Sequence, residues 1–168
     1  FLTIVAWIIF VGLCIEAGGL VVNFIFSLYK PEFVQNLYQK LDLSEMYTRS
    51  KWDFFNMYTF ILAISLLKAY LFYIVIPLVS KLDLAKPFNN FVSAQITQIS
   101  YFTLAIGLLS SLAQHTAKNL LQQGYEIDTL DQFWADSEAF ILMSAIIYII
   151  ATIIKRGIEI QNENDLTV

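Results

Sequence analysis

Long apolar runs separated by short polar segments dominate the chain. Four runs are long enough to cross a bilayer, because a helix needs about 20 residues to span about 30 Å of hydrocarbon. They cover residues 1–29, 54–79, 91–114 and 139–154. The pattern therefore predicts an all-α polytopic membrane protein, with four transmembrane helices packed in a bundle.

The polar connections differ in character. The first outer connection, residues 30–53, contains "KPEFVQNLYQKLDL", in which Phe33, Leu37 and Leu41 are spaced four apart. This spacing places the three side chains on one face and predicts a short amphipathic helix at the membrane interface or across the end of the bundle. No connection is long enough to hold a soluble domain. Residues 1–168 are therefore expected to form a single transmembrane domain, ending in a tail at residues 155–168.

Composition agrees with a membrane protein and narrows its function. Hydrophobic residues make up 58% of the chain and charged residues only 14%, against about a quarter charged in an ordinary soluble domain. The formal charge of −4 argues against direct nucleic-acid binding.

The chain begins on Phe1 rather than Met, so we expect a short segment to precede it. The first run is too long for the h-region of a signal peptide, which is about 7–15 residues.

Charge alone does not determine the orientation. An even number of spans places both termini and the turn "SKLDLAKPFNN" on one side of the membrane. The basic residues on that side are Lys81, Lys86, Lys155 and Arg156, and those on the other side are Lys30, Lys40, Arg49, Lys51 and Lys118. With four basic residues on one side and five on the other, the positive-inside rule does not decide the orientation of the chain. The acidic character of residues 118–138 favours an external loop there, and hence internal termini.

Two ionisable residues, Glu16 and Lys68, fall inside predicted spans, where charge is costly. At 1.5 Å per residue, Glu16 lies about 18 Å and Lys68 about 22 Å from the outer ends of two antiparallel neighbours. The similar depth predicts a buried Glu16–Lys68 pair. Three roles stay open: a structural pair that fixes helix register, a proton relay or ligand cavity, or no contact at all, with Lys68 reaching for water.

Small and polar residues also line up within the spans. Gly12, Glu16, Gly19 and Asn23 are spaced by four, three and four, so they occupy about 60° of the first helix. Such a stripe predicts close helix packing that shields polar groups from lipid. Polar positions recur along the third and fourth runs, at Gln95, Gln98, Ser100, Ser111, Gln114, Ser144, Tyr148 and Thr152. Interhelical hydrogen bonds are expected there, with a small polar cavity as the alternative.

Catalytic and metal chemistry is not indicated. Ser111 and His115 are one helical turn apart, but neither an orienting carboxylate nor a nucleophile-elbow motif accompanies them. With one cysteine and one histidine, the chain has no clustered metal-ligand spacing, and no phosphate-binding or dinucleotide motif is present. We expect a protein that is not an enzyme, without catalytic residues, bound metal or cofactor.

Two segments resemble a bacterial family of small four-span membrane proteins catalogued as domain of unknown function 2975. One is the closing segment "IIKRGIEIQNENDLTV", and the other is the turn "LDLAKPF". The tail motif comprises Glu163, Asn164, Asp165, Leu166, Thr167 and Val168, and the turn motif includes Asp83, Lys86, Pro87 and Phe88. The four-span layout agrees along the whole chain, with little identity elsewhere. The family has no established activity, and many members are encoded beside a small helix-turn-helix regulator of the Xre type.

The resemblance implies a bacterial inner-membrane protein with both termini in the cytoplasm, where such a regulator would be. The first functional hypothesis is a non-enzymatic interaction or sensor protein in signalling. It would dock the regulator through the cytoplasmic turn and the tail, with Leu166 and Val168 as apolar anchors. Other expected partners are membrane lipid and, as an open alternative, further copies in a homo-oligomer.

The tail itself has more than one interpretation. Ile158 and Ile160 alternate with polar residues and could add as a strand to the edge of a partner. Alternatively, residues 155–161 continue the fourth helix, or the tail folds back on the turn and closes the bundle. The competing function is a small carrier or binder of an apolar or amphipathic molecule, held in an intramembrane cavity around Glu16 and Lys68.

Overall fold

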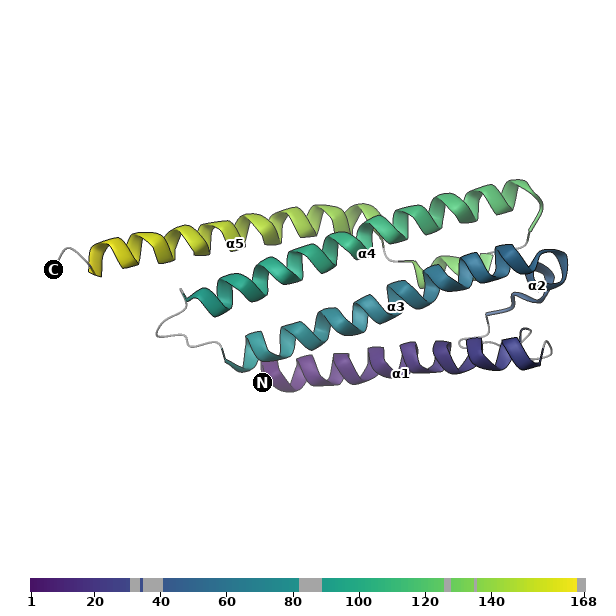
Figure 1. Ribbon diagram of the computed structural model, residues 1–168, viewed down its shortest axis with the longest axis horizontal. Coiled ribbons are helices and arrows are strands. Elements are labelled where there is room, and N and C mark those ends of the chain that lie inside the picture. Colours follow the sequence, from purple (N-terminus) through teal and green to yellow (C-terminus); the bar gives the residue numbers. More distant parts are fainter. Residues whose placement is uncertain (31–33, 35–40, 82–88, 126–127, 135, 166–168) are drawn as a thin grey trace.

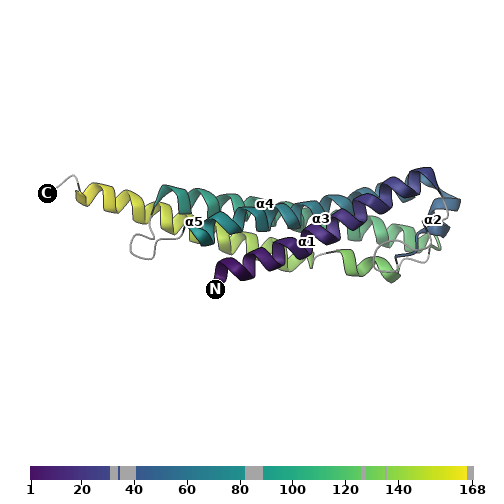
Figure 2. The same ribbon diagram turned by 90° about the horizontal axis from the view of Figure 1, so that it is seen from below.

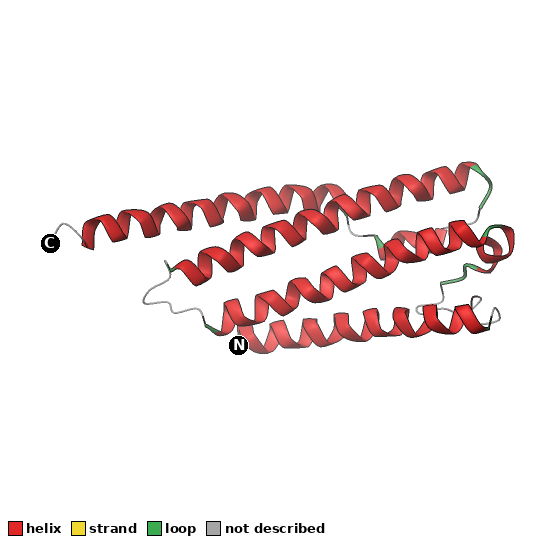
Figure 3. Ribbon diagram, viewed as in Figure 1, coloured by secondary structure: helices red, strands yellow, loops and turns green. Residues whose placement is uncertain are grey.

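The computed structural model describes residues 1–30, 34, 41–81, 89–125, 128–134 and 136–165. Every regular element in these residues is helical, which confirms the predicted all-α class (Figure 3). The elements are α1 (Leu2–Tyr29), α2 (Ser44–Arg49), α3 (Lys51–Ser80), α4 (Asn90–Gln122), the 3-10 helix η3 (Asp128–Phe133) and α5 (Ser137–Asp165). The four long helices are apolar enough to cross a membrane, so the chain is a multi-pass membrane protein.

Two of the spanning helices continue beyond the predicted apolar spans. Helix α4 continues past residue 114, where the predicted span ends, as far as Gln122. Helix α5 continues past residue 154 as far as Asp165. At 1.5 Å per residue, the 33 residues of α4 measure about 50 Å, more than the hydrocarbon core of about 30 Å. Hydropathy finds only the part of a helix that lipid surrounds, so helix α4 must tilt or project from the membrane.

Local capping determines where α4 begins and ends. The Oδ1 atom of Asn89 accepts a hydrogen bond from the backbone N–H of Val92 at 2.9 Å, as an N-cap does. At the other end, Gly124 has a φ of 83°, and the N–H of Tyr125 reaches back to the carbonyl of Leu120 at 3.2 Å. Glycine adopts this left-handed conformation with little strain, so it terminates the helix in a Schellman motif.

The long helices pack in chain order, α1 on α3, α3 on α4 and α4 on α5. Figure 1 shows α1 and α5 on opposite sides of the central pair, and Figure 2 shows the bundle from below, with α1 in front. The most apolar stretch of α3 and of α4 has 33% of its residues buried, against 17% for α1 and for α5. The outer helices therefore turn most of their apolar surface to lipid.

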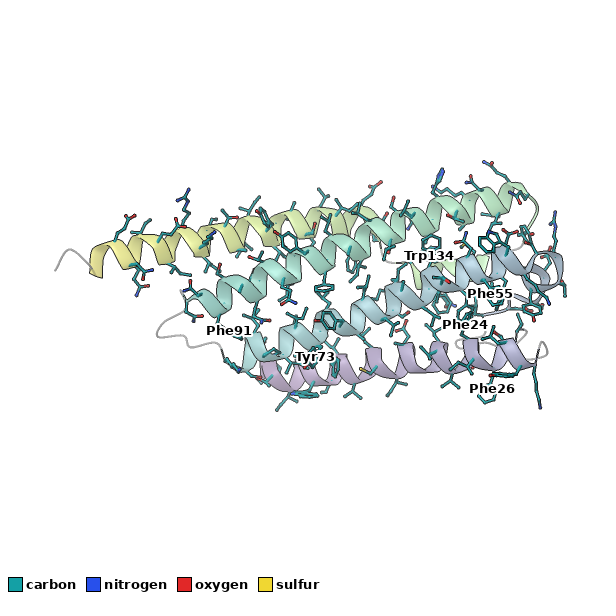
Figure 4. The ribbon with its side chains drawn as sticks, in the orientation of Figure 1. Phe24, Phe26, Phe55, Tyr73, Phe91 and Trp134 are labelled. Carbon is teal, nitrogen blue, oxygen red and sulfur yellow. The ribbon has the colours of Figure 1, made fainter. Side chains whose placement is uncertain are left out.

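The α1–α3 interface is built from aromatic side chains. The hydroxyl of Tyr58 is buried and donates a hydrogen bond to the carbonyl of Leu20 at 2.9 Å. The ring of Phe24 lies 5.0 Å from the ring of Tyr58 and 6.0 Å from that of Phe55, between the two helices (Figure 4). These large side chains hold α1 against α3.

The α4–α5 interface depends instead on a missing side chain. A Cβ atom added to Gly107 would lie 2.8 Å from Cγ1 of Ile141 and 3.2 Å from Cβ of Phe140. These distances are shorter than van der Waals contact, so only glycine lets the two helices approach this closely. Close backbone approach at small residues is a common way for helices to associate within lipid.

Both chain termini lie at one end of the bundle, which we call the termini end, whereas α2 and η3 lie at the other, the loop end (Figure 1). The amphipathic helix predicted around Phe33 and Leu37 falls outside the described residues. The helix described within that connection is α2, which packs against α3 and buries Met46.

Arg49 links the two outer connections at the loop end. Its guanidinium donates hydrogen bonds to the carbonyls of Gln123, at 2.8 Å, and Gly124, at 3.5 Å. The same group lies 4.5 Å from the ring centre of Tyr125, whose hydroxyl donates to Asp53 at 3.1 Å. Burial of Tyr125 raises the pKa of its phenol, and the hydrogen bond to the Asp53 carboxylate raises it further. These contacts fasten α2 and α3 to the end of α4.

Candidate functional site at the termini end

The predicted Glu16–Lys68 pair is not formed in this structure. Both side chains are half-buried. Among the residues that the structure describes, ion pairs join Arg49 to Glu45 at 4.0 Å and Arg156 to Glu159 at 2.7 Å, and neither pair includes Glu16 or Lys68. Glu16 and Lys68 therefore do not form an ion pair with each other in this conformation.

Helix rotation explains why matching depths did not produce a contact. Tyr58 faces α1, because its hydroxyl bonds to Leu20. Lys68 follows Tyr58 by ten residues, and at 3.6 residues per turn it points about 80° away from that direction. Glu16 precedes Leu20 by four residues and stays within about 40° of it. The acid thus lies close to the α1–α3 contact, whereas the lysine is turned away from α1.

The predicted packing stripe on α1 is wrong at Gly12. This residue is exposed, and a Cβ atom placed there would meet nothing within 4 Å. Gly19 and Asn23 are only half-buried. The residues that α1 does bury are Ala6, Ala17, Leu20 and Ser27. These buried residues lie on a different face of α1 from the predicted stripe, and large aromatic side chains from α3 can fill the space beside them. The small-residue stripe therefore lies on the flank of the interface.

The tail is helical as far as Asp165, so the predicted strand at Ile158 and Ile160 is wrong. The alternative, continuation of the fourth helix through residues 155–161, is confirmed and extends further. From Lys155 onwards this extension measures about 16 Å at 1.5 Å per residue. Figure 1 shows it projecting beyond the ends of the other helices.

One side of this helical extension is available to a partner. Ile158 is buried, whereas Ile160 is 58% exposed and Gln161 and Asn162 are exposed beside it. Leu166, Thr167 and Val168 lie outside the described residues, as does the turn motif of Asp83, Lys86, Pro87 and Phe88. Whether the tail touches that turn therefore stays a prediction.

A groove of about 290 Å³ opens at the termini end where α1, α3 and α4 meet. Its lining residues are Trp7, Tyr70, Tyr73, Ile74, Ile76, Pro77, Gln95 and Gln98. Pro77 has no N–H, so the carbonyl of Tyr73 cannot receive its usual helical hydrogen bond. The Oε1 atom of Gln95 is buried and has no hydrogen-bond partner among the described atoms. The wall of the groove is therefore mainly apolar and aromatic, with the side chains of two glutamines in it.

This groove differs from the cavity predicted around Glu16 and Lys68, which do not line it. Sequence reasoning singled out Gln95 and Gln98 as polar residues within a span. The residues of α3 that line the groove were not predicted. The available signal for them was Pro77, because a proline within an apolar run is unusual in a helix. The aromatic wall gave no such signal, because tyrosine and tryptophan near span ends usually mark the membrane interface.

Comparison with known proteins adds no relative. No protein-family model, curated protein or solved structure matches this chain. The resemblance to the four-span bacterial family therefore depends on the "LDLAKPF" and "ENDLTV" segments of the sequence.

Proposed function

We propose that the protein is a non-enzymatic docking or sensor protein of the bacterial inner membrane, with both termini in the cytoplasm. It acts by presenting the end of α5 to a soluble partner. The observation that carries this proposal is the unbroken α5 helix, which continues to Asp165 beyond the other helices.

A projecting helix is suited to recognition by the groove of a partner. Such recognition uses apolar anchors on one helix face, and the ordering cost is small when the helix exists before binding. Ile160 is the exposed apolar side chain in this position, flanked by Gln161 and Asn162. The family resemblance suggests the partner class, a small helix-turn-helix DNA-binding regulator. Holding such a regulator at the membrane would couple the state of the bundle to transcription.

Removal of the tail tests the proposal. Membranes containing the intact chain, or a version cut after Gly157, are solubilised, and co-purifying proteins are quantified by mass spectrometry. We expect a small DNA-binding protein to be retained by the intact chain and lost with the cut chain. The same partner list with both forms would refute the proposal.

A point substitution separates docking from general loss of the tail. Ile160→Glu should weaken retention about tenfold, because burying an isoleucine at an interface contributes about 1.5–3 kcal/mol. Gln161→Glu adds the same charge at the next residue without removing an apolar side chain, so it should leave retention nearly unchanged. Equal effects of the two variants would point to charge rather than to a helix anchor.

A further inference from the structure

A second groove runs between α4 and α5 at the termini end, on surface that the docking proposal does not use. It consists of two hollows that share Tyr101. The outer hollow, about 490 Å³, is lined by polar residues that include Asn90, Gln98 and Lys155. The inner hollow, about 330 Å³, extends along the same two helices over mainly apolar surface. We call the two together the α4–α5 groove.

Three hydroxyl groups of the groove donate hydrogen bonds within their own helices. The hydroxyl of Thr97 donates to the carbonyl of Ser93 at 2.8 Å, and that of Ser100 donates to the carbonyl of Thr97 at 2.7 Å. On the facing helix, the hydroxyl of Ser144 donates to the carbonyl of Ile141 at 2.6 Å. The donors left for a bound molecule therefore include the ammonium of Lys155 and the side-chain amides of Asn90 and Gln98.

Lys155 supplies a positive charge at the outer end of the groove. Among the described residues it makes no ion pair, whereas the neighbouring Arg156 is paired with Glu159 at 2.7 Å. Lys155 lies about 27 Å along α5 from Ser137 at 1.5 Å per residue. Since the hydrocarbon core is about 30 Å thick, the ammonium lies near the depth of lipid head groups.

The inner end of the groove is apolar. Leu104 of α4 and Ile141 and Ala145 of α5 line it, and the rings of Tyr101 and Tyr148 lie 6.1 Å apart across it. Along the groove, the order is thus cation and amide donors at the membrane surface, then phenol rings, then hydrocarbon. An amphiphile with an anionic head group and an acyl chain would match this order, with its head group at the cation and its chain on the hydrocarbon.

We propose that the α4–α5 groove binds an anionic glycerophospholipid. Its phosphate pairs with Lys155 and accepts hydrogen bonds from the Asn90 and Gln98 amides, while an acyl chain covers Leu104 and Ala145. The N-terminal dipole of α4 adds to the attraction for the phosphate. A zwitterionic lipid is disfavoured, because its ammonium group would lie close to that of Lys155.

Charge removal at two adjacent residues tests the head-group contact. The full chain in detergent is titrated with phosphatidylglycerol or phosphatidylcholine, and bound lipid is counted by native mass spectrometry. Lys155→Gln should weaken phosphatidylglycerol binding about tenfold, the usual effect of losing a charge-assisted hydrogen bond. Lys155→Arg should retain binding. Arg156→Gln removes the same charge outside the groove and should change binding less than about twofold.

Blocking the inner hollow tests the acyl-chain contact without changing charge. Ala145→Phe should weaken phosphatidylglycerol binding, with helicity and elution volume unchanged. Glycerol 1-phosphate, which carries the head group alone, should bind more weakly than the lipid. Equal losses from Lys155→Gln and Arg156→Gln would indicate a general basic surface and overturn the proposal. Glycerol 1-phosphate binding as tightly as the lipid, or equal binding of phosphatidylcholine, would overturn it as well.

Discussion

The two ends of the bundle use their side chains in opposite ways. At the loop end, Phe54, Leu130 and Phe133 are almost completely buried, and Arg49 bonds across to the end of α4. At the termini end, the helices leave grooves lined by glutamine, tyrosine and lysine side chains, and α5 projects alone.

The difference suggests that the loop end contributes mainly to the stability of the fold, whereas the termini end holds the candidate binding surfaces. The loop-end contacts join segments far apart in the sequence, so they hold the four spans in place. The termini end has fewer such contacts, and the proposed binding surfaces for a lipid and a partner, the grooves and the projecting end of α5, lie there. Substitutions at the loop end should therefore reduce stability, whereas matched substitutions at the termini end should leave the fold intact.

The largest effect is expected from Tyr58→Ala. Removing a fully buried aromatic side chain and its hydrogen bond to Leu20 should lower the free energy of unfolding by about 3–5 kcal/mol. Tyr73→Ala at the termini end, where the side chain is 58% exposed, should cost less than about 1 kcal/mol. Unfolding in SDS, followed by circular dichroism, measures both variants. Similar losses would show that the two ends contribute equally.

The next largest effect is expected at the α4–α5 contact. Gly107→Leu should destabilise the fold by about 1–3 kcal/mol, because the new side chain would overlap Ile141. Gly18→Leu on α1 is the matched control, since nothing lies within 4 Å of the added Cβ atom. It should stay within about 0.5 kcal/mol of the unmodified protein in the same SDS titration. A tolerated Gly107→Leu would contradict the close helix approach.

Two arginines allow a direct comparison of charge at the two ends. Arg49→Gln should cost about 1 kcal/mol, because the guanidinium bonds to backbone carbonyls but remains half exposed. Arg156→Gln removes an exposed pair with Glu159 and should cost less than about 0.5 kcal/mol. Unfolding at low and high salt would distinguish a fixed bridge at Arg49 from a screened surface charge.

The smallest effect concerns the alkaline stability of the loop end. The pKa of Tyr125 is raised in the folded protein, so its contribution is complete below the unfolded value of about 10. It is lost as pH rises through the folded value. Stability measured from pH 8 to pH 11.5 should therefore fall less steeply in Tyr125→Phe than in the unmodified protein. Identical slopes would show that this phenol does not titrate with unfolding.

Local sequence signals predicted much of the fold. Apolar runs of about 20 residues identified the four spans because lipid requires both that length and satisfied backbone groups. Helix ends were harder to predict. The extensions of α4 to Gln122 and of α5 to Asp165 are rich in polar residues, so their mean hydropathy is that of a loop although their residues are compatible with helix.

The candidate site was less predictable than the spans. Gln95, Gln98 and Tyr148 were recognised as polar residues within apolar runs, and each lines a groove in the structure. Gly12 was expected to pack and is exposed, whereas Gly107 makes the close approach. The spacing of small residues shows which helix face could pack, but the neighbouring helix determines which face does.

The sequence by itself determined the class of protein, the number of spans and their approximate depth, because these depend on hydrophobicity and length along one chain. Only the tertiary structure decided how each helix is rotated about its axis. That rotation turns Lys68 away from α1, and it brings Lys155 and Tyr148 of α5 to the groove with α4. The physical reason is that rotation depends on how side chains of two helices fill the space between them, which neither helix specifies alone.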